Sequence, residues 1–151
     1  MKQWKAIEDV LDFAINGEEE AVQFYTGLAA RAEKSWMREI FEGFAREEQG
    51  HKAKLIAIKE GGGEMPAPAK VQDLKIGDYL VDQKPDPELD YQQALILAMK
   101  KEKAAFRLYC DLAEIAPNEK LRQTFQALAQ EEAKHKLRFE IEYDDNILKE
   151  N

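Results

Sequence analysis

Cysteine and histidine are scarce in this chain of 151 residues, which contains one cysteine, Cys110, and two histidines, His51 and His135. A single cysteine can form no intramolecular disulfide and cannot supply a four-cysteine iron or zinc site. Any metal that this chain binds must therefore be held by oxygen and nitrogen donors.

Long apolar runs and an excess of basic residues are also missing. No apolar run approaches the roughly 20 residues that a membrane-spanning helix needs, and charges interrupt the N-terminal segment MKQWKAIEDVLDF, unlike a secretory signal. We therefore expect a cytoplasmic protein with no membrane partner. The net charge of -8 argues against nucleic acid as a partner, because nucleic acids bind basic faces. The length predicts one domain, residues 1–151.

Apolar residues recur at alternating steps of three and four along four long segments, which predicts four amphipathic helices. The segments run from Trp4 to Ala32, from Met37 to Ile58, from Tyr91 to Leu112 and from Leu121 to Phe139. Together with the residues that flank these apolar positions, helices of about 25 to 30 residues are expected, and these would be roughly 40 Å long. The sequence therefore predicts an all-α fold, a four-helix bundle with a continuous inner seam.

Capping residues predict where these helices begin and end. Ser35 and Asn118 are suited to cap helix starts, and Pro87 to the first turn of the third helix. The run Gly61–Gly63 is expected to end the second helix, and Pro117 to separate the third from the fourth.

The connections between the helices predict their pairing. Tight turns near Glu33 and near Pro117 make two antiparallel hairpins. Residues 61–86, rich in glycine and proline, form a crossover long enough to let the second and third helices run parallel. The stretch VQDLKIGDYL within it predicts a short helix. A connection of this length also permits two chains to exchange hairpins. We expect a homodimer, with or without such an exchange.

Charged residues occupy the apolar stripe of every predicted helix. The rhythm of the first helix places Glu18 inward between Ala14 and Ala21, and that of the third places Glu102 inward. The second and fourth helices each contribute a Glu-x-x-His pair to the same stripe. These pairs are Glu48 with His51 and Glu132 with His135.

These inward groups require a compensating positive charge. Burying a carboxylate costs several kcal/mol, and four carboxylates facing one another also repel. No inward lysine or arginine is predicted to balance them. All six groups lie near the middle of their helices, so we expect them to meet at one level.

An internal repeat relates the two hairpins. AINGEEEAVQFY, from Ala14, aligns without gaps to AMKKEKAAFRLY, from Ala98, at an offset of 84 residues. The same offset of 84 residues relates four pairs of candidate site residues, two within these stretches and two beyond them. These are Glu18 and Glu102, Tyr25 and Tyr109, Glu48 and Glu132, and His51 and His135. Two carboxylates and one imidazole from each hairpin predict a pseudo-symmetric site for two cations, with iron, manganese or zinc as the metal.

These motifs resemble those of the rubrerythrin branch of the ferritin-like di-iron carboxylate proteins, from Ala6 to about Phe139. The shared pattern is a Glu followed by Ala three and Tyr seven positions later, then Glu-x-x-His about 30 residues on, twice over. The resemblance implies a di-iron site in which Glu18 and Glu102 are terminal ligands and Glu48 and Glu132 bridge the two metals. It implies that His51 and His135 each bind one metal. Tyr25 and Tyr109 are implied to donate hydrogen bonds to the ligands.

Two departures from the family shape the expected activity. Rubrerythrins add a four-cysteine rubredoxin-like module, which one cysteine cannot form, so electrons are expected from an external donor such as a rubredoxin-like protein. Rubrerythrins also carry an additional glutamate one turn beyond the third-helix ligand, where this chain has Ala105. The leading hypothesis is an oxidoreductase that reduces peroxide or dioxygen. The alternatives are an iron-storage or metal-sensing protein without turnover, and a dimanganese catalase-like enzyme.

Overall fold

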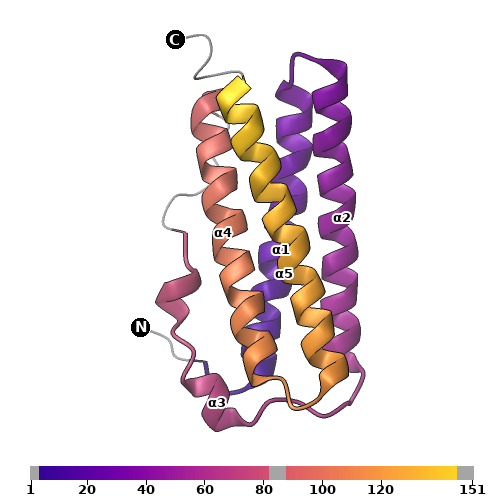
Figure 1. The fold of residues 1–151 in the computed structure, drawn as a ribbon, viewed down its shortest axis with the longest axis vertical. Helices are drawn as coiled ribbons and strands as arrows, with labels where there is room; N and C mark the ends of the chain where they lie inside the picture. Colours follow the sequence, from indigo (N-terminus) through magenta and orange to yellow (C-terminus); the bar gives the residue numbers. More distant parts are fainter. Residues whose placement is uncertain (1–3, 82–87, 146–151) are drawn as a thin grey trace. The chain divides into compact units, whose positions relative to one another are not determined.

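Helices are the only regular elements in the part of the chain that the computed structural model describes, residues 4–81 and 88–145 (Figure 1). The predicted all-α fold class is therefore confirmed. Within the same residues, no helix has both the length and the apolar character that a membrane crossing requires. The chain divides after Leu74 into two compact units.

The first unit is a hairpin of α1, Ile7–Arg31, and α2, Ser35–Glu60, which pack side by side in opposite directions (Figure 1). The apolar pattern of the first predicted helix begins at Trp4, but α1 begins three residues later, at Ile7. Trp4 is buried although it lies before the helix. A short helix, α3, Pro68–Gln72, contacts α1. The side-chain amide of Gln72 donates a hydrogen bond to the Lys5 carbonyl at 3.3 Å.

The second unit is the corresponding hairpin of α4, Tyr91–Ile115, and α5, Glu119–Tyr143. A 3-10 turn, η1, Ile76–Tyr79, packs on α4. The Tyr79 hydroxyl donates to a carboxylate oxygen of Asp111 at 2.5 Å. The stretch VQDLKIGDYL is thus the end of α3 followed by η1 rather than one short helix, because Asp73 to Lys75 break the helical hydrogen bonding.

The helix caps agree with the sequence at one predicted position and differ at another. Asn118 caps α5, and its side-chain oxygen accepts from the Leu121 N–H at 2.9 Å, which confirms the prediction. The prediction that Ser35 caps α2 is wrong. Lys34 has the extended backbone of the capping residue, and its carbonyl accepts the first helical hydrogen bonds, so Ser35 is already helical.

The remaining helix boundaries concern the end of α2 and the start of α4. α2 ends at Glu60 as the glycine run predicts, and Gly62 has a φ of 67°, which favours glycine. The predicted role of Pro87 lies outside the described residues. Asp90 caps α4, where its carboxylate accepts from the Gln93 N–H at 2.7 Å.

Replacing Asn118 with alanine should lower the free energy of unfolding by about 1 kcal/mol, because the Leu121 N–H loses its acceptor. Ser35→Ala is the matched control and should change the free energy of unfolding by less than about 0.5 kcal/mol, because Lys34 and not Ser35 is the capping residue of α2. Urea denaturation of both variants measures the difference. Equal losses would show that Asn118 does not stabilise α5 through its cap.

Candidate metal centre

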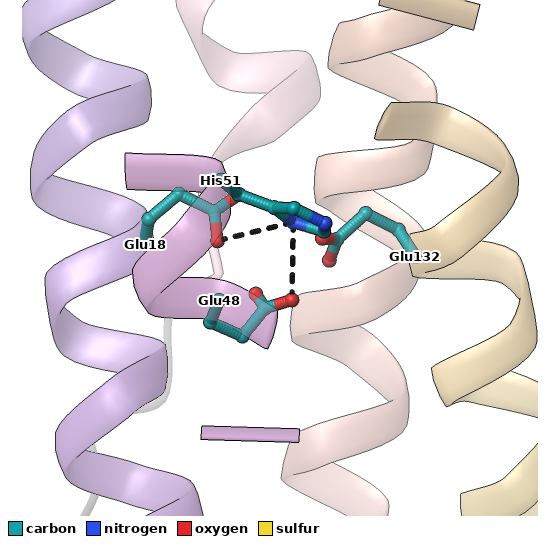
Figure 2. Close-up of side chains that lie close together, drawn as sticks. All are labelled: Glu18, Glu48, His51 and Glu132. Carbon is teal, nitrogen blue, oxygen red and sulfur yellow. Dashed lines mark ion pairs between the residues drawn. The ribbon is translucent and has the colours of Figure 1, made fainter. Parts of the chain in front are cut away.

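The first hairpin brings three of the predicted site residues together. Glu18 extends from α1 toward Glu48 and His51 on α2 (Figure 2). His51 Nδ1 lies 3.3 Å from Glu48 Oε1 and 3.7 Å from Glu18 Oε2. All three side chains are buried, and each offers a donor atom within 4.8 Å of the other two. We call these residues the first triad.

The second hairpin repeats the arrangement with Glu102 on α4 and with Glu132 and His135 on α5. His135 Nδ1 lies 3.7 Å from Glu102 Oε1, the same separation as in the equivalent pair of the first triad. These side chains are buried as well, and their donor atoms also lie within 4.8 Å of one another. We call them the second triad. The 84-residue repeat therefore extends from sequence to side-chain geometry.

Helix periodicity explains why each triad forms. Residues three apart on a helix lie on one face, so Glu48 and His51 point the same way from α2. The facing helix of each hairpin then needs only one inward carboxylate at the same level. Glu18 and Glu102 supply it, each from near the middle of its helix.

The buried environment of the first triad favours a Glu18 carboxyl group that is protonated or balanced by a positive charge. Burial raises the pKa of Glu18 from 4.5 to about 8, and the negative charge of Glu48 adds to this, whereas hydrogen bonding to His51 lowers the pKa. The protein therefore holds Glu18 in an environment that disfavours its carboxylate form. A cation bound at the triad would stabilise the carboxylate instead.

The donor set of each triad fits a divalent metal ion. Two ligands about 2.1 Å from one metal lie roughly 3.0 to 3.4 Å apart at octahedral or tetrahedral angles. The 3.3 Å separation between His51 and Glu48 lies in this range, and the 3.7 Å separations lie just beyond it. One imidazole with two carboxylates suits iron, manganese or zinc.

The predicted tyrosines and the cysteine lie near the triads in the chain. Tyr25 and Tyr109 are fully buried, and the Tyr25 ring meets Phe44 edge-on with centroids 6.2 Å apart. Their hydrogen bonding to the ligands stays a prediction. Cys110 is half-buried, and burial raises the pKa of its thiol, as do the charges of Asp111 and Glu114. A raised pKa makes it a weak nucleophile.

One further buried carboxylate, Glu142 on α5, is absent from the residues predicted to point inward. The Tyr91 hydroxyl donates to Glu142 Oε1 at 3.1 Å and links the two ends of this hairpin. A signal was present, because Glu142 continues the inward rhythm of His135 and Phe139 by a step of three. Glu142 belongs to neither triad.

The observed fold and triads define a class of protein, an all-helical protein with buried glutamate and histidine clusters suited to metal binding. A family model described as Rubrerythrin matches residues 9–143. This match covers most of the chain, which therefore belongs to the rubrerythrin family and has a ferritin-like helical fold. The resemblance noted from the sequence is thus confirmed.

A solved structure supports the fold independently. It is described as Hypothetical Protein Pfu-1136390-001 from Pyrococcus furiosus, and its TM-score with this chain is 0.70. The match has 24% sequence identity and covers 92% of this chain and 89% of the other. No curated protein matches this chain significantly.

The raised pKa of Glu18 predicts that the metal-free protein loses stability as the pH rises. Between about 4.5 and about 8 the unfolded chain releases this proton while the folded chain retains it, so unfolding becomes easier. Relative to Glu18→Gln, the parent should lose a few kcal/mol across this range, since one pKa unit is worth about 1.4 kcal/mol.

Urea denaturation of both metal-free proteins at several pH values measures this difference. The control is Glu20→Gln, which alters an exposed carboxylate on α1 and should keep the parent's pH dependence. Identical pH dependence in the parent and Glu18→Gln would contradict the prediction.

Proposed function

We propose that the two triads together bind two iron ions. Glu18 and Glu102 are proposed as terminal ligands, Glu48 and Glu132 as bridging ligands, and the histidines as the nitrogen donor to one iron each. The support is that each triad buries two carboxylates beside one imidazole. Buried carboxylates need positive charge, and two divalent ions balance four carboxylates.

Iron is preferred over the other candidates because of the donor set and the family. Carboxylate oxygen and imidazole nitrogen accept iron, manganese and zinc. Zinc undergoes no redox chemistry, so it would leave the centre with a structural or binding role. Membership of the rubrerythrin family favours iron as the redox-active choice.

On this basis we propose that the protein is an oxidoreductase that reduces peroxide or dioxygen. The iron pair, when bound, supplies two electrons that cleave the O–O bond of peroxide, which takes up two protons to give two water molecules. The observation that carries the proposal is the pair of buried triads with matching donor sets.

The chain's own residues define what the protein contributes. The triads fix the donor atoms on helices, which hold them more rigidly than loops. Burial excludes bulk water, which strengthens electrostatic interactions at the site. Tyr25 and Tyr109 are proposed to donate hydrogen bonds that orient the ligands. Ala105 cannot act as a ligand, so the family's redox-linked exchange involving an additional glutamate is not part of this proposal.

Electrons are proposed to come from a separate redox protein. Cys110 is the only cysteine in these 151 residues, so they cannot form the four-cysteine iron site of a rubredoxin-like module. We propose that an external carrier re-reduces the diferric pair. A rubredoxin-like protein has suitable chemistry, because its iron carries one electron at a time.

Removal of a bridging ligand should reduce metal binding. Glu48→Ala and Glu132→Ala should each bind less than the parent's amount of iron and gain less thermal stability from ferrous ion. The matched controls are Glu47→Ala and Glu131→Ala, which remove the adjacent carboxylates and should bind iron as the parent does. Metal analysis and thermal unfolding measure both effects. Unchanged iron content in both bridging variants would refute the ligand assignment.

The proposed redox function is tested on protein loaded with iron without oxygen and then given one equivalent of peroxide. We expect about two irons per chain and an oxo-bridged diferric absorption band, with peroxide consumed continuously only when a reductant is supplied. Oxygen release without a reductant would instead favour the dimanganese catalase-like alternative. Uptake of many irons per chain into a large shell would favour storage, and a centre that peroxide leaves unchanged would refute the proposal.

A further inference from the structure

The internal repeat conserves the triads but not the surface charge beside them. Residues 16–23 around Glu18 contain three glutamates and no lysine or arginine. The equivalent residues 100–107 around Glu102 contain one glutamate, the ligand candidate itself, and four basic residues. The chain is acidic overall, so this stretch of α4 is a local exception.

One pair of equivalent positions shows the difference clearly. In the first hairpin, Lys52 Nζ lies 2.7 Å from Glu19 Oε1 and joins α2 to α1 beside the first triad. The 84-residue offset maps Glu19 to Lys103 and Lys52 to Lys136. The second hairpin therefore has two lysines where the first has an ion pair.

The 84-residue repeat places these two lysines on adjoining faces of α4 and α5, along the line where the two helices meet, which we call the outer groove. The ion pair of the first hairpin shows that the equivalent positions face each other across the outer groove between its helices. Lys103 is exposed, and Lys136 Nζ pairs with Glu140 on its own helix at 2.5 Å. Pairs this exposed contribute little to stability and exchange partners readily.

An exposed aromatic side chain adds an apolar contact to the same groove. Phe106 is three residues after Lys103 on α4, so the two are neighbours on the helix surface. Phe106 is 39% exposed, which is unusual for phenylalanine. We call Lys103, Phe106 and Lys136 the docking face.

We propose that the docking face binds an acidic one-electron carrier protein that re-reduces the metal centre. Lys103 follows Glu102 in the chain and Lys136 follows His135, so a partner seated here is separated from the second triad by little more than one helix. An aromatic contact flanked by lysines suits a partner with an acidic rim around an apolar centre. This proposal rests on the proposed function of the centre.

The charge of the whole protein does not oppose such docking. Charges farther apart than about 8 Å are largely screened at physiological salt. The partner therefore responds mainly to the local lysines and not to the net charge of -8. The remaining acidic surface repels it weakly, which directs it to this groove. Two carrier molecules, each losing one electron, restore the two electrons that one peroxide consumes.

The test measures how fast reduced, acidic rubredoxin is oxidised by the iron-loaded, diferric protein in a stopped-flow instrument. Lys103→Glu should lower the second-order rate constant about tenfold at low salt and weaken its salt dependence. The matched control is Lys54→Glu, the same change at an exposed lysine of α2, which should reduce the rate much less. Equal rates for the two variants would overturn the proposal.

The apolar contact is tested in the same way. Phe106→Ser should weaken binding of zinc-substituted rubredoxin about tenfold by calorimetry. Leu137→Ser, which alters an exposed leucine of α5, is the control and should bind as the parent does. A Phe106→Ser protein that binds as tightly as the parent would overturn the apolar part of the docking face.

Two further measurements separate this proposal from its alternatives. If Lys103→Glu converts an oligomer to a smaller species by light scattering, the groove is an interface between copies of this chain and the proposal fails. Dithionite, a small reductant, reports on the centre alone. If peroxide fails to reoxidise the dithionite-reduced centre, the proposed function fails, whereas normal reoxidation with a donor rate insensitive to Lys103 overturns only the docking face.

Discussion

The burial of carboxylates beside imidazoles within helical hairpins is the constraint on which the rest of this structure depends. Glu18, Glu48 and His51 are nearly inaccessible to water in one hairpin, and their equivalents are so in the other. Such groups are costly unless neutralised. The apolar packing of the helices that carry them offsets this cost, and a bound metal ion would remove much of it.

The two hairpins show how a duplicated unit can keep its chemistry while its surface diverges. The inward stripe is constrained, because each triad needs two carboxylates and one histidine at set spacing. The outer groove is not, so the Glu19 to Lys52 ion pair of the first hairpin is replaced by two lysines in the second. Divergence of this kind gives the two triads different surface charge beside them.

Periodicity in the sequence was sufficient to predict the helices and the inward position of all six triad residues. The spacing of apolar residues by three and four positions identifies the buried face of a helix, regardless of which element packs against that face. The same spacing places Glu142 inward, although a charged residue is usually expected at the surface. Helix caps were harder to predict. Both Lys34 and Ser35 lie at the start of α2, and only the backbone conformation shows which of them is the N-cap residue.

The sequence by itself determined the all-helical class, the two hairpins, the repeat and the donor types available for a metal, because these follow from spacing along one helix and from composition. Only the tertiary structure decided the 3.3 Å and 3.7 Å separations within the triads, the raised pKa of Glu18 and the Tyr91 to Glu142 hydrogen bond. These depend on how two helices pack against each other. Side-chain distances and burial arise from that packing, and no pattern along a single chain segment contains them.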